Sequence, residues 1–165
     1  MLKKSLSLLD RSVEIAIVVI FAAMVIVGGM QVFNRSLLNE SLSWSEEFQK
    51  YAHIWLIFLA IPVGYRRGAH IGMSMFAKKF PMNVQFALTM LTDALWLMFA
   101  GAIVTYTTVI MQVAKGQTSA GLGLRMDRVY LGLLLGGAYL AIVVLRRTGE
   151  HISEVRAGRF KGLGP

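Results

Sequence analysis

The chain has 165 residues, of which 56% are hydrophobic and 16% are charged, and its mean hydropathy is +0.60. A soluble domain usually carries about 25% charged residues, so this composition argues against a water-soluble enzyme. It also argues against a disordered chain, which needs low hydrophobicity. The formal charge of +8 would suggest nucleic-acid binding in a soluble protein. Cysteine is absent, which excludes disulfides, thiolate metal sites and cysteine nucleophiles.

Four apolar segments predict an all-α membrane protein with four transmembrane helices, at about residues 13–33, 47–65, 84–112 and 129–145. A helix rises about 1.5 Å per residue, so about 20 residues cross the hydrocarbon core. The third segment is longer than this and must tilt strongly or project beyond the membrane. The fourth contains a G-x-x-x-G pattern at Gly132 and Gly136, which would let a neighbouring helix approach closely.

A shorter helix is predicted between the second and third spans, at about residues 69–80. Its apolar residues Met73, Phe76 and Phe80 recur at helical spacing, and Lys78 and Lys79 can reach toward the headgroups. This pattern is typical of an amphipathic helix in the membrane interface. Residues 1–148 are therefore expected to form one membrane domain, followed by an exposed cytoplasmic tail at 149–165.

The positions of the basic residues predict the orientation of the chain. Most of the 17 lysine and arginine residues lie in the N-terminal segment, the middle loop and the C-terminal tail. Such an excess marks the cytoplasmic side, so both termini are expected in the cytoplasm. Basic residues at this level bind anionic lipid headgroups, and this interpretation of the +8 charge is preferred over nucleic-acid binding.

Asp93 lies inside the third apolar segment, where an unpaired acid costs several kcal/mol. One interpretation is a proton or ion site. The other is a packing or subunit-contact residue, or an acid near the inner interface on a helix longer than the bilayer.

The remaining polar residues give weaker indications of function. His53, His70 and His151 lie at different predicted depths, which argues against bis-histidine haem ligation. Glu46 and Lys50 form a favourable i, i+4 pair at the start of the second span, explained either by local structure or by an outward protein contact. We see no nucleophile–base pair and expect no enzyme, cofactor or metal site. The residues alone indicate a subunit of a larger assembly.

One stretch carries a resemblance to a known family. It comprises Asn34-Arg35, W-x-E-E at residues 44–47, aromatic residues in the following helix, and R-R-G-A-H-I at residues 66–71. This ordered combination resembles the small permease subunit (DctQ-like) of tripartite ATP-independent periplasmic (TRAP) transporters. Length and span pattern extend the likeness to about residues 1–148.

The resemblance implies a role in organic-acid uptake across the bacterial inner membrane. In this family a large membrane subunit of about twelve spans holds the substrate and sodium sites, and a soluble periplasmic binding protein delivers the substrate. The small subunit acts as a fixed scaffold beside the large subunit's moving elevator domain. The competing hypothesis is a stand-alone, homo-oligomeric, proton-coupled transporter.

Three groups of residues are expected to take part in this role. The residues expected to face and dock the periplasmic partner are Trp44, Glu46, Glu47, Lys115, Arg125 and Arg128. The residues expected to anchor the inner loop to the membrane are Arg66, Arg67, His70, Lys78 and Lys79. The residues expected to contact the large subunit are Asp93, Gly132 and Gly136.

Overall fold

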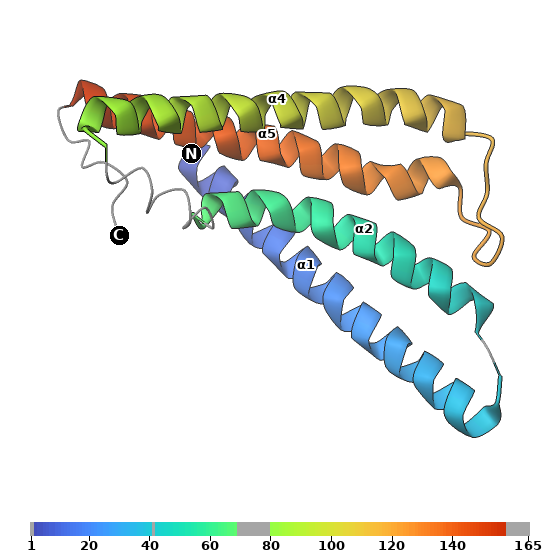
Figure 1. Cartoon of the computed structure of the whole chain (residues 1–165). Coiled ribbons are helices and arrows are strands. Elements are labelled where there is room, and N and C mark those ends of the chain that lie inside the picture. Colours follow the sequence, from blue (N-terminus) through green and yellow to red (C-terminus); the bar gives the residue numbers. More distant parts are fainter. Residues whose placement is uncertain (1, 41, 69–79, 158–165) are drawn as a thin grey trace.

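The computed structural model describes residues 2–40, 42–68 and 80–157, and these form four long helices (Figure 1). The helices are α1 (Leu2–Phe33), α2 (Ser43–Arg66), α4 (Met82–Ala114) and α5 (Met126–Arg156), and a short π-helical turn, η1 (Asn34–Leu38), follows α1. The all-α prediction is confirmed for this part of the chain. The predicted interfacial helix, with His70, Lys78 and Lys79, lies outside the described residues.

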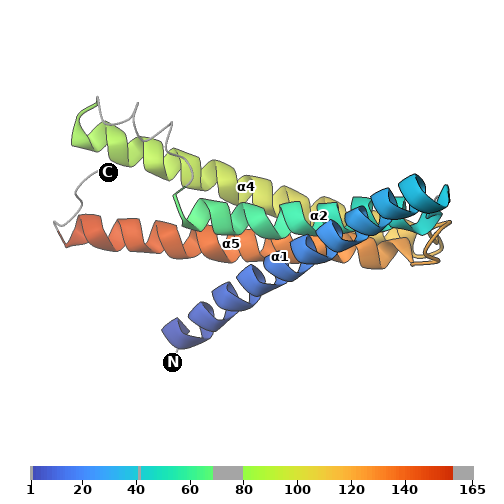
Figure 2. The same cartoon turned by 90° about the horizontal axis from the view of Figure 1, so that it is seen from below.

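The helices pack in a row, α4 along α5, α5 along α2 and α2 along α1. Figure 2 shows α1 crossing the others obliquely. We call one end of the bundle the terminal end, because α1 and α4 begin there and α2 and α5 end there (Figure 1). We call the other the loop end, and it carries η1 and residues 115–125. Residues distant in sequence therefore meet at each end.

Several helix boundaries differ from the prediction. The first helix begins at Leu2 rather than at residue 13, and the second at Ser43 rather than at residue 47. The last helix continues to Arg156, so residues 149–156 of the predicted tail are helical. In this last part of α5, Thr148 and His151 contact Asp93 of α4. The end of α5 therefore packs against α4.

The core lies between α2, α4 and α5 and includes Tyr65, Ala100, Leu140 and Val144. Close packing at the predicted G-x-x-x-G pattern is present, and the helix that approaches is α2 of the same chain. A Cβ at Gly136 would lie 2.4 Å from the carbonyl oxygen of Phe58. This carbonyl is four residues before Pro62, which has no N–H to donate to it. Gly136 therefore packs directly on the Phe58 carbonyl, which accepts no helical hydrogen bond from residue 62 because that residue is a proline.

Among the described residues, three segments are long and apolar enough to cross a membrane: Leu6–Leu38, Met82–Ala114 and Met126–Arg156. The helix α2 is not among them and carries Gln49, Lys50 and His53 in its first half. Large apolar side chains cover the outer faces of α1 and α4, where, for example, Val18 and Met98 are 66% and 67% exposed. These exposed faces are suited to lipid or to a partner within the membrane.

Candidate functional site

A cluster of charged side chains at the terminal end joins α1, α2 and α5. Asp10 of α1 is buried, and its carboxylate accepts a hydrogen bond from the Tyr139 hydroxyl at 2.8 Å. The guanidinium groups of Arg66 and Arg146 lie 2.5 Å and 3.2 Å from the same carboxylate. Because a buried charge is costly without partners, these contacts explain how Asp10 is accommodated within the helix bundle.

Glu14 extends this cluster one turn along α1. Its carboxylate pairs with Arg66 and, at 3.0 Å, with Arg67. Arg66 and Arg67, predicted to anchor the inner loop to the membrane, thus also join the end of α2 to α1. Membrane anchoring by these two residues stays a prediction.

A second cluster surrounds Asp93, which is 4% exposed. The Tyr65 hydroxyl of α2 donates a hydrogen bond to its carboxylate. From α5, Thr148 Oγ1 and His151 Nδ1 lie 3.0 Å and 3.4 Å from the other carboxylate oxygen. Arg147 holds Tyr65 in place by donating to its carbonyl at 2.9 Å, with its guanidinium 5.0 Å from the ring centre. Asp93 therefore joins α2, α4 and α5.

The Asp93 cluster lies level with the last turn of α2, since Tyr65 is the residue before the helix ends. The first part of α4, from Met82 to Asp93, therefore extends beyond the end of α2. Of the interpretations offered for Asp93, these contacts agree with a packing residue between helices of this chain, and its level relative to a membrane stays a prediction.

At the loop end, polar contacts arrange α1 and the α4–α5 loop around α2. The backbone N–H of Leu122 donates to the Glu47 carboxylate at 3.0 Å, and the Trp55 indole donates to the Val129 carbonyl at 3.0 Å. On the other side of α2, the Gln49 amide donates to the Met24 carbonyl of α1 at 2.7 Å. These hydrogen bonds fix the loop and the start of α5 to one side of α2, and α1 to the other.

The residues predicted to dock a periplasmic partner all lie at the loop end, but their surroundings differ. Glu46, Lys115, Arg125 and Arg128 are exposed. Glu47 binds backbone of the α4–α5 loop, and Gly121 of this loop packs so closely on α2 that a Cβ would lie 3.3 Å from the Trp44 Cα. Docking by this set stays a prediction, whereas the structure shows that Glu47 organises the loop.

The residues predicted to contact a large subunit are buried inside this chain. Asp93 has the partners described above, Gly136 packs on Phe58, and a Cβ at Gly132 would lie 2.7 Å from the Trp55 ring. Contact with a second subunit stays a prediction for these residues, and any such contact would have to replace one within the chain.

Sequence reasoning missed several residues of these clusters, chiefly Asp10, Tyr139, Arg146 and Thr148. Tyrosine and threonine inside apolar helices give no signal of their own, because each is common in packed helices. Asp10 and Glu14, four residues apart on one helix, together with the Arg66-Arg67 pair, could have indicated a contact between α1 and the end of α2. Among the described residues, no group of three or more His, Asp and Glu side chains could hold a metal ion.

Comparison with known proteins adds independent information on this chain. Residues 24–154 match the model of the family described as tripartite ATP-independent periplasmic transporters, DctQ component. A protein of Haemophilus influenzae whose name describes it as a TRAP transporter small permease is 23% identical over 161 residues. That alignment covers 98% of this chain and 100% of the relative.

Two further relatives match over shorter segments. The sialic acid TRAP transporter small permease protein SiaQ of Vibrio cholerae is 26% identical over 103 residues, which is 62% of this chain and 60% of SiaQ. The isethionate TRAP transporter permease protein DctMQ of Oleidesulfovibrio alaskensis is 26% identical over 105 residues, again 62% of this chain but 16% of that protein. In both cases the matched segment covers less than two thirds of the relative.

Proposed function

Because the chain belongs to the DctQ component family of tripartite ATP-independent periplasmic transporters, we propose that it is the fixed scaffold subunit of a sodium-driven, binding-protein-dependent transporter. Its partners are a large permease subunit, which carries the substrate and sodium sites and moves as an elevator, and a soluble periplasmic binding protein. This chain itself is neither an enzyme nor the carrier of the solute.

The observation that carries the proposal is the spacing between the polar contacts at the two ends of the bundle. At about 1.5 Å per residue, α2 rises about 33 Å from Ser43 to Tyr65, and α4 rises about 32 Å from Asp93 to Ala114. The same calculation gives about 33 Å for α5 from Met126 to Thr148. These distances match the thickness of a hydrocarbon core, about 30 Å.

This spacing supports four membrane spans, with α2 crossing beside α1 and α5 despite its polar first half. Parts of α4 and α5 beyond the Asp93 level then project from the membrane, as expected for helices of 33 and 31 residues. The basic excess at the terminal end supports a cytoplasmic position for both termini, and hence our proposal that the chain lies in the bacterial inner membrane with the loop end outside.

The pairing of the buried acids supports a scaffold role. Asp10 and Asp93 each contact side chains of two other helices of this chain. Such contacts hold the helices at a fixed depth and orientation, as a support for a moving neighbour requires. A carrier would need polar groups free to exchange their partners for a solute or a proton.

The loop end supplies the surface proposed for the binding protein. Glu46, Lys115 and Arg125 are exposed there, while Glu47 keeps the α4–α5 loop in position. Charged groups at the edge of an interface chiefly control association rate and partner choice. Charge reversal at Glu46 should therefore reduce uptake while co-purification with the large subunit persists.

The substrate class proposed is an organic acid, carboxylic or sulfonic. Two of the relatives are named for sialic acid and for isethionate, and both compounds are organic anions. Substrate choice resides in the partner subunits, so the binding protein encoded with this chain should identify the solute by its own ligand binding.

Uptake into proteoliposomes tests the proposal. We expect uptake of the binding protein's ligand only when this chain, the large subunit, the binding protein and an inward sodium gradient are all present. Omission of any one should abolish it. Sodium-independent or proton-driven uptake by this chain alone would instead establish the stand-alone transporter.

The spans are tested separately by single-cysteine labelling, since the natural chain has no cysteine. In intact spheroplasts, Lys115→Cys and Glu40→Cys should react with a membrane-impermeant maleimide, whereas Arg67→Cys should react only after permeabilisation. Equal reaction at all three sites would contradict the proposed orientation.

A further inference from the structure

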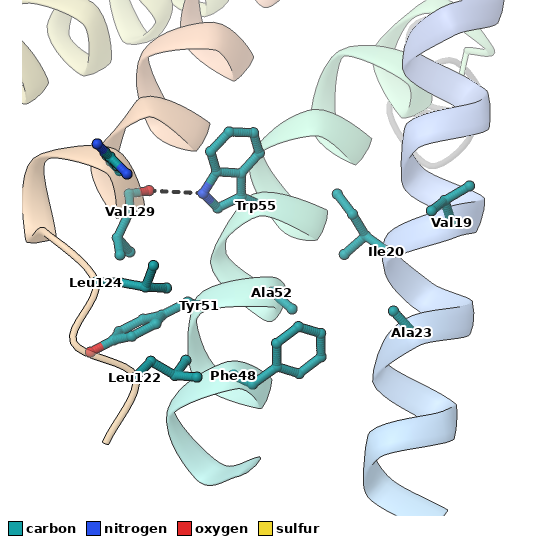
Figure 3. A pocket seen from close by; sticks show the side chains of 11 residues that line it. Val19, Ile20, Ala23, Phe48, Tyr51, Ala52, Trp55, Leu122, Leu124 and Val129 are labelled. Atoms are coloured by element: carbon teal, nitrogen blue, oxygen red, sulfur yellow. Dashed lines mark hydrogen bonds between the residues drawn. The ribbon is translucent and has the colours of Figure 1, made fainter. Parts of the chain in front are cut away.

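An apolar groove at the loop end is not explained by the proposed scaffold role. It has a volume of about 480 Å³ and lies on α2, between α1 on one side and the α4–α5 loop with the start of α5 on the other (Figure 3). In Figure 3, Ala23 of α1 and Phe48, Ala52 and Trp55 of α2 line it, and Leu122 closes it on the loop side. Its volume lies within the range of about 300–1,000 Å³ found for small-molecule sites.

The walls of this groove are held by hydrogen bonds. The Glu47 carboxylate binds the Leu122 backbone, the Trp55 indole binds the Val129 carbonyl, and Gln49 binds the Met24 carbonyl. Each of these bonds joins α2 to one of the elements that flank the groove. The groove is therefore a formed feature of the fold, with a floor and two walls in fixed positions.

Arg128 is the charged residue among those that line the groove, and it lies in the first turn of α5 at the loop end. The neighbouring Arg125 pairs with Asp127 at 2.7 Å. Arg128 forms no salt bridge with any residue that the structure describes, although its charge interacts with the neighbouring Asp127. It is exposed, so its guanidinium is available to an anion at the mouth of the groove.

Together these features match the chemistry of a phospholipid. From Phe48 to Trp55 the groove follows α2 for about 10 Å, within the half-thickness of about 15 Å that one leaflet contributes to the hydrocarbon core. The wall residues suit an acyl chain, and arginine binds phosphate in a bidentate manner at the level of the headgroups.

We propose that this groove binds one phospholipid of the leaflet at the loop end, with an acyl chain over Ala52 and the phosphate at Arg128. This proposal rests on the membrane placement proposed above but not on the transport role. The bound lipid fills the space between α1 and α5, so it completes the packing of the bundle where these helices diverge.

The test uses the complex with the large subunit in nanodiscs of phosphatidylethanolamine and phosphatidylglycerol. The probe is phosphatidylglycerol with a photoreactive diazirine in its acyl chain, and the lipid adduct is mapped by peptide mass spectrometry. We expect adducts on residues 48–55 of α2. Arg128→Gln should lower their yield about tenfold, as expected for the loss of a charged hydrogen bond, and the matched variant Arg125→Gln should leave it unchanged.

A second variant, Ala52→Phe, fills the groove and should remove the same adducts while labelling of the exposed face of α4 continues. Equal yields in Arg128→Gln and Arg125→Gln would overturn phosphate recognition. Absence of adducts on α2 in the complex, with loss of co-purification in Ala52→Phe, would identify a segment of the large subunit as the occupant and overturn the proposal. The readout is a lipid adduct on this chain. Its result is therefore independent of the uptake experiment, so failure of the lipid proposal can be distinguished from failure of the transport role.

Discussion

The contact between Gly136 and the Phe58 carbonyl makes a quantitative prediction about helix packing. In Gly136→Ala the added methyl group would lie 2.4 Å from the carbonyl oxygen and 2.7 Å from the carbonyl carbon. Both atoms are backbone, so the clash is relieved only if α2 and α5 move apart. Overpacking of this kind costs about 1–3 kcal/mol, against a gain of up to about 1 kcal/mol from the higher helix propensity of alanine.

Gly101→Ala is the matched control, because Gly101 is inside α4 and a Cβ there would meet nothing within 4 Å. This variant makes the same chemical change and keeps the gain in helix propensity of about 1 kcal/mol without the clash. Because the propensity gain is common to both variants, they should differ by the overpacking cost alone, about 1–3 kcal/mol in the free energy of unfolding. For a chain of this size that corresponds to roughly 2–12 °C in the unfolding temperature.

The assay is thermal unfolding of the purified chain in detergent, followed by intrinsic tryptophan fluorescence. We expect the unfolding midpoint of Gly136→Ala to lie below both the natural chain and Gly101→Ala. Equal midpoints for the two variants would refute the close backbone packing of α2 on α5.

Three further predictions concern the polar contacts. Asp10→Asn removes the charge that faces two arginines and should destabilise the chain by about 1–3 kcal/mol. We expect a lower unfolding midpoint in detergent, and an unchanged midpoint would count against the charged cluster around Asp10. Tyr65→Phe deletes the hydroxyl that donates to Asp93 and should cost a similar amount, whereas a rise in stability would contradict that hydrogen bond. Glu47→Gln should speed tryptic cleavage in the loop at residues 115–125, while Glu46→Gln should not, and equal cleavage of both variants would exclude the proposed support of the loop.

The fold was largely predictable from the sequence, because apolar segments of membrane length are strong signals. Their ends were less predictable. Helix α5 continues past the apolar segment to Arg156, and its last turns are polar, so hydrophobicity gave no reason to extend it. The contacts of Thr148 and His151 with Asp93 depend on a residue more than fifty positions away, which periodicity does not reveal.

The candidate site was predictable only in part. Asp93 was identified correctly as a residue that needs a partner, since burial of a charge is costly wherever it occurs. The partner itself depends on how α2 and α5 pack, and this is set by glycine contacts whose neighbours a sequence does not specify. Glu46 and Glu47 are adjacent and chemically alike, yet one is exposed and the other binds the loop backbone. They differ only in the direction in which each side chain leaves the helix, and this direction depends on how α2 packs.

The central claim is that this chain is a fixed support, and its internal distances during transport test this most directly. Spin labels at Arg35→Cys and Lys115→Cys would report on α1 relative to α4 by pulsed electron paramagnetic resonance, in the complete transporter with and without sodium and substrate. We predict an unchanged distance distribution, with large changes between this chain and the large subunit's elevator domain. A shift between the two labels that follows substrate and sodium would contradict the scaffold role.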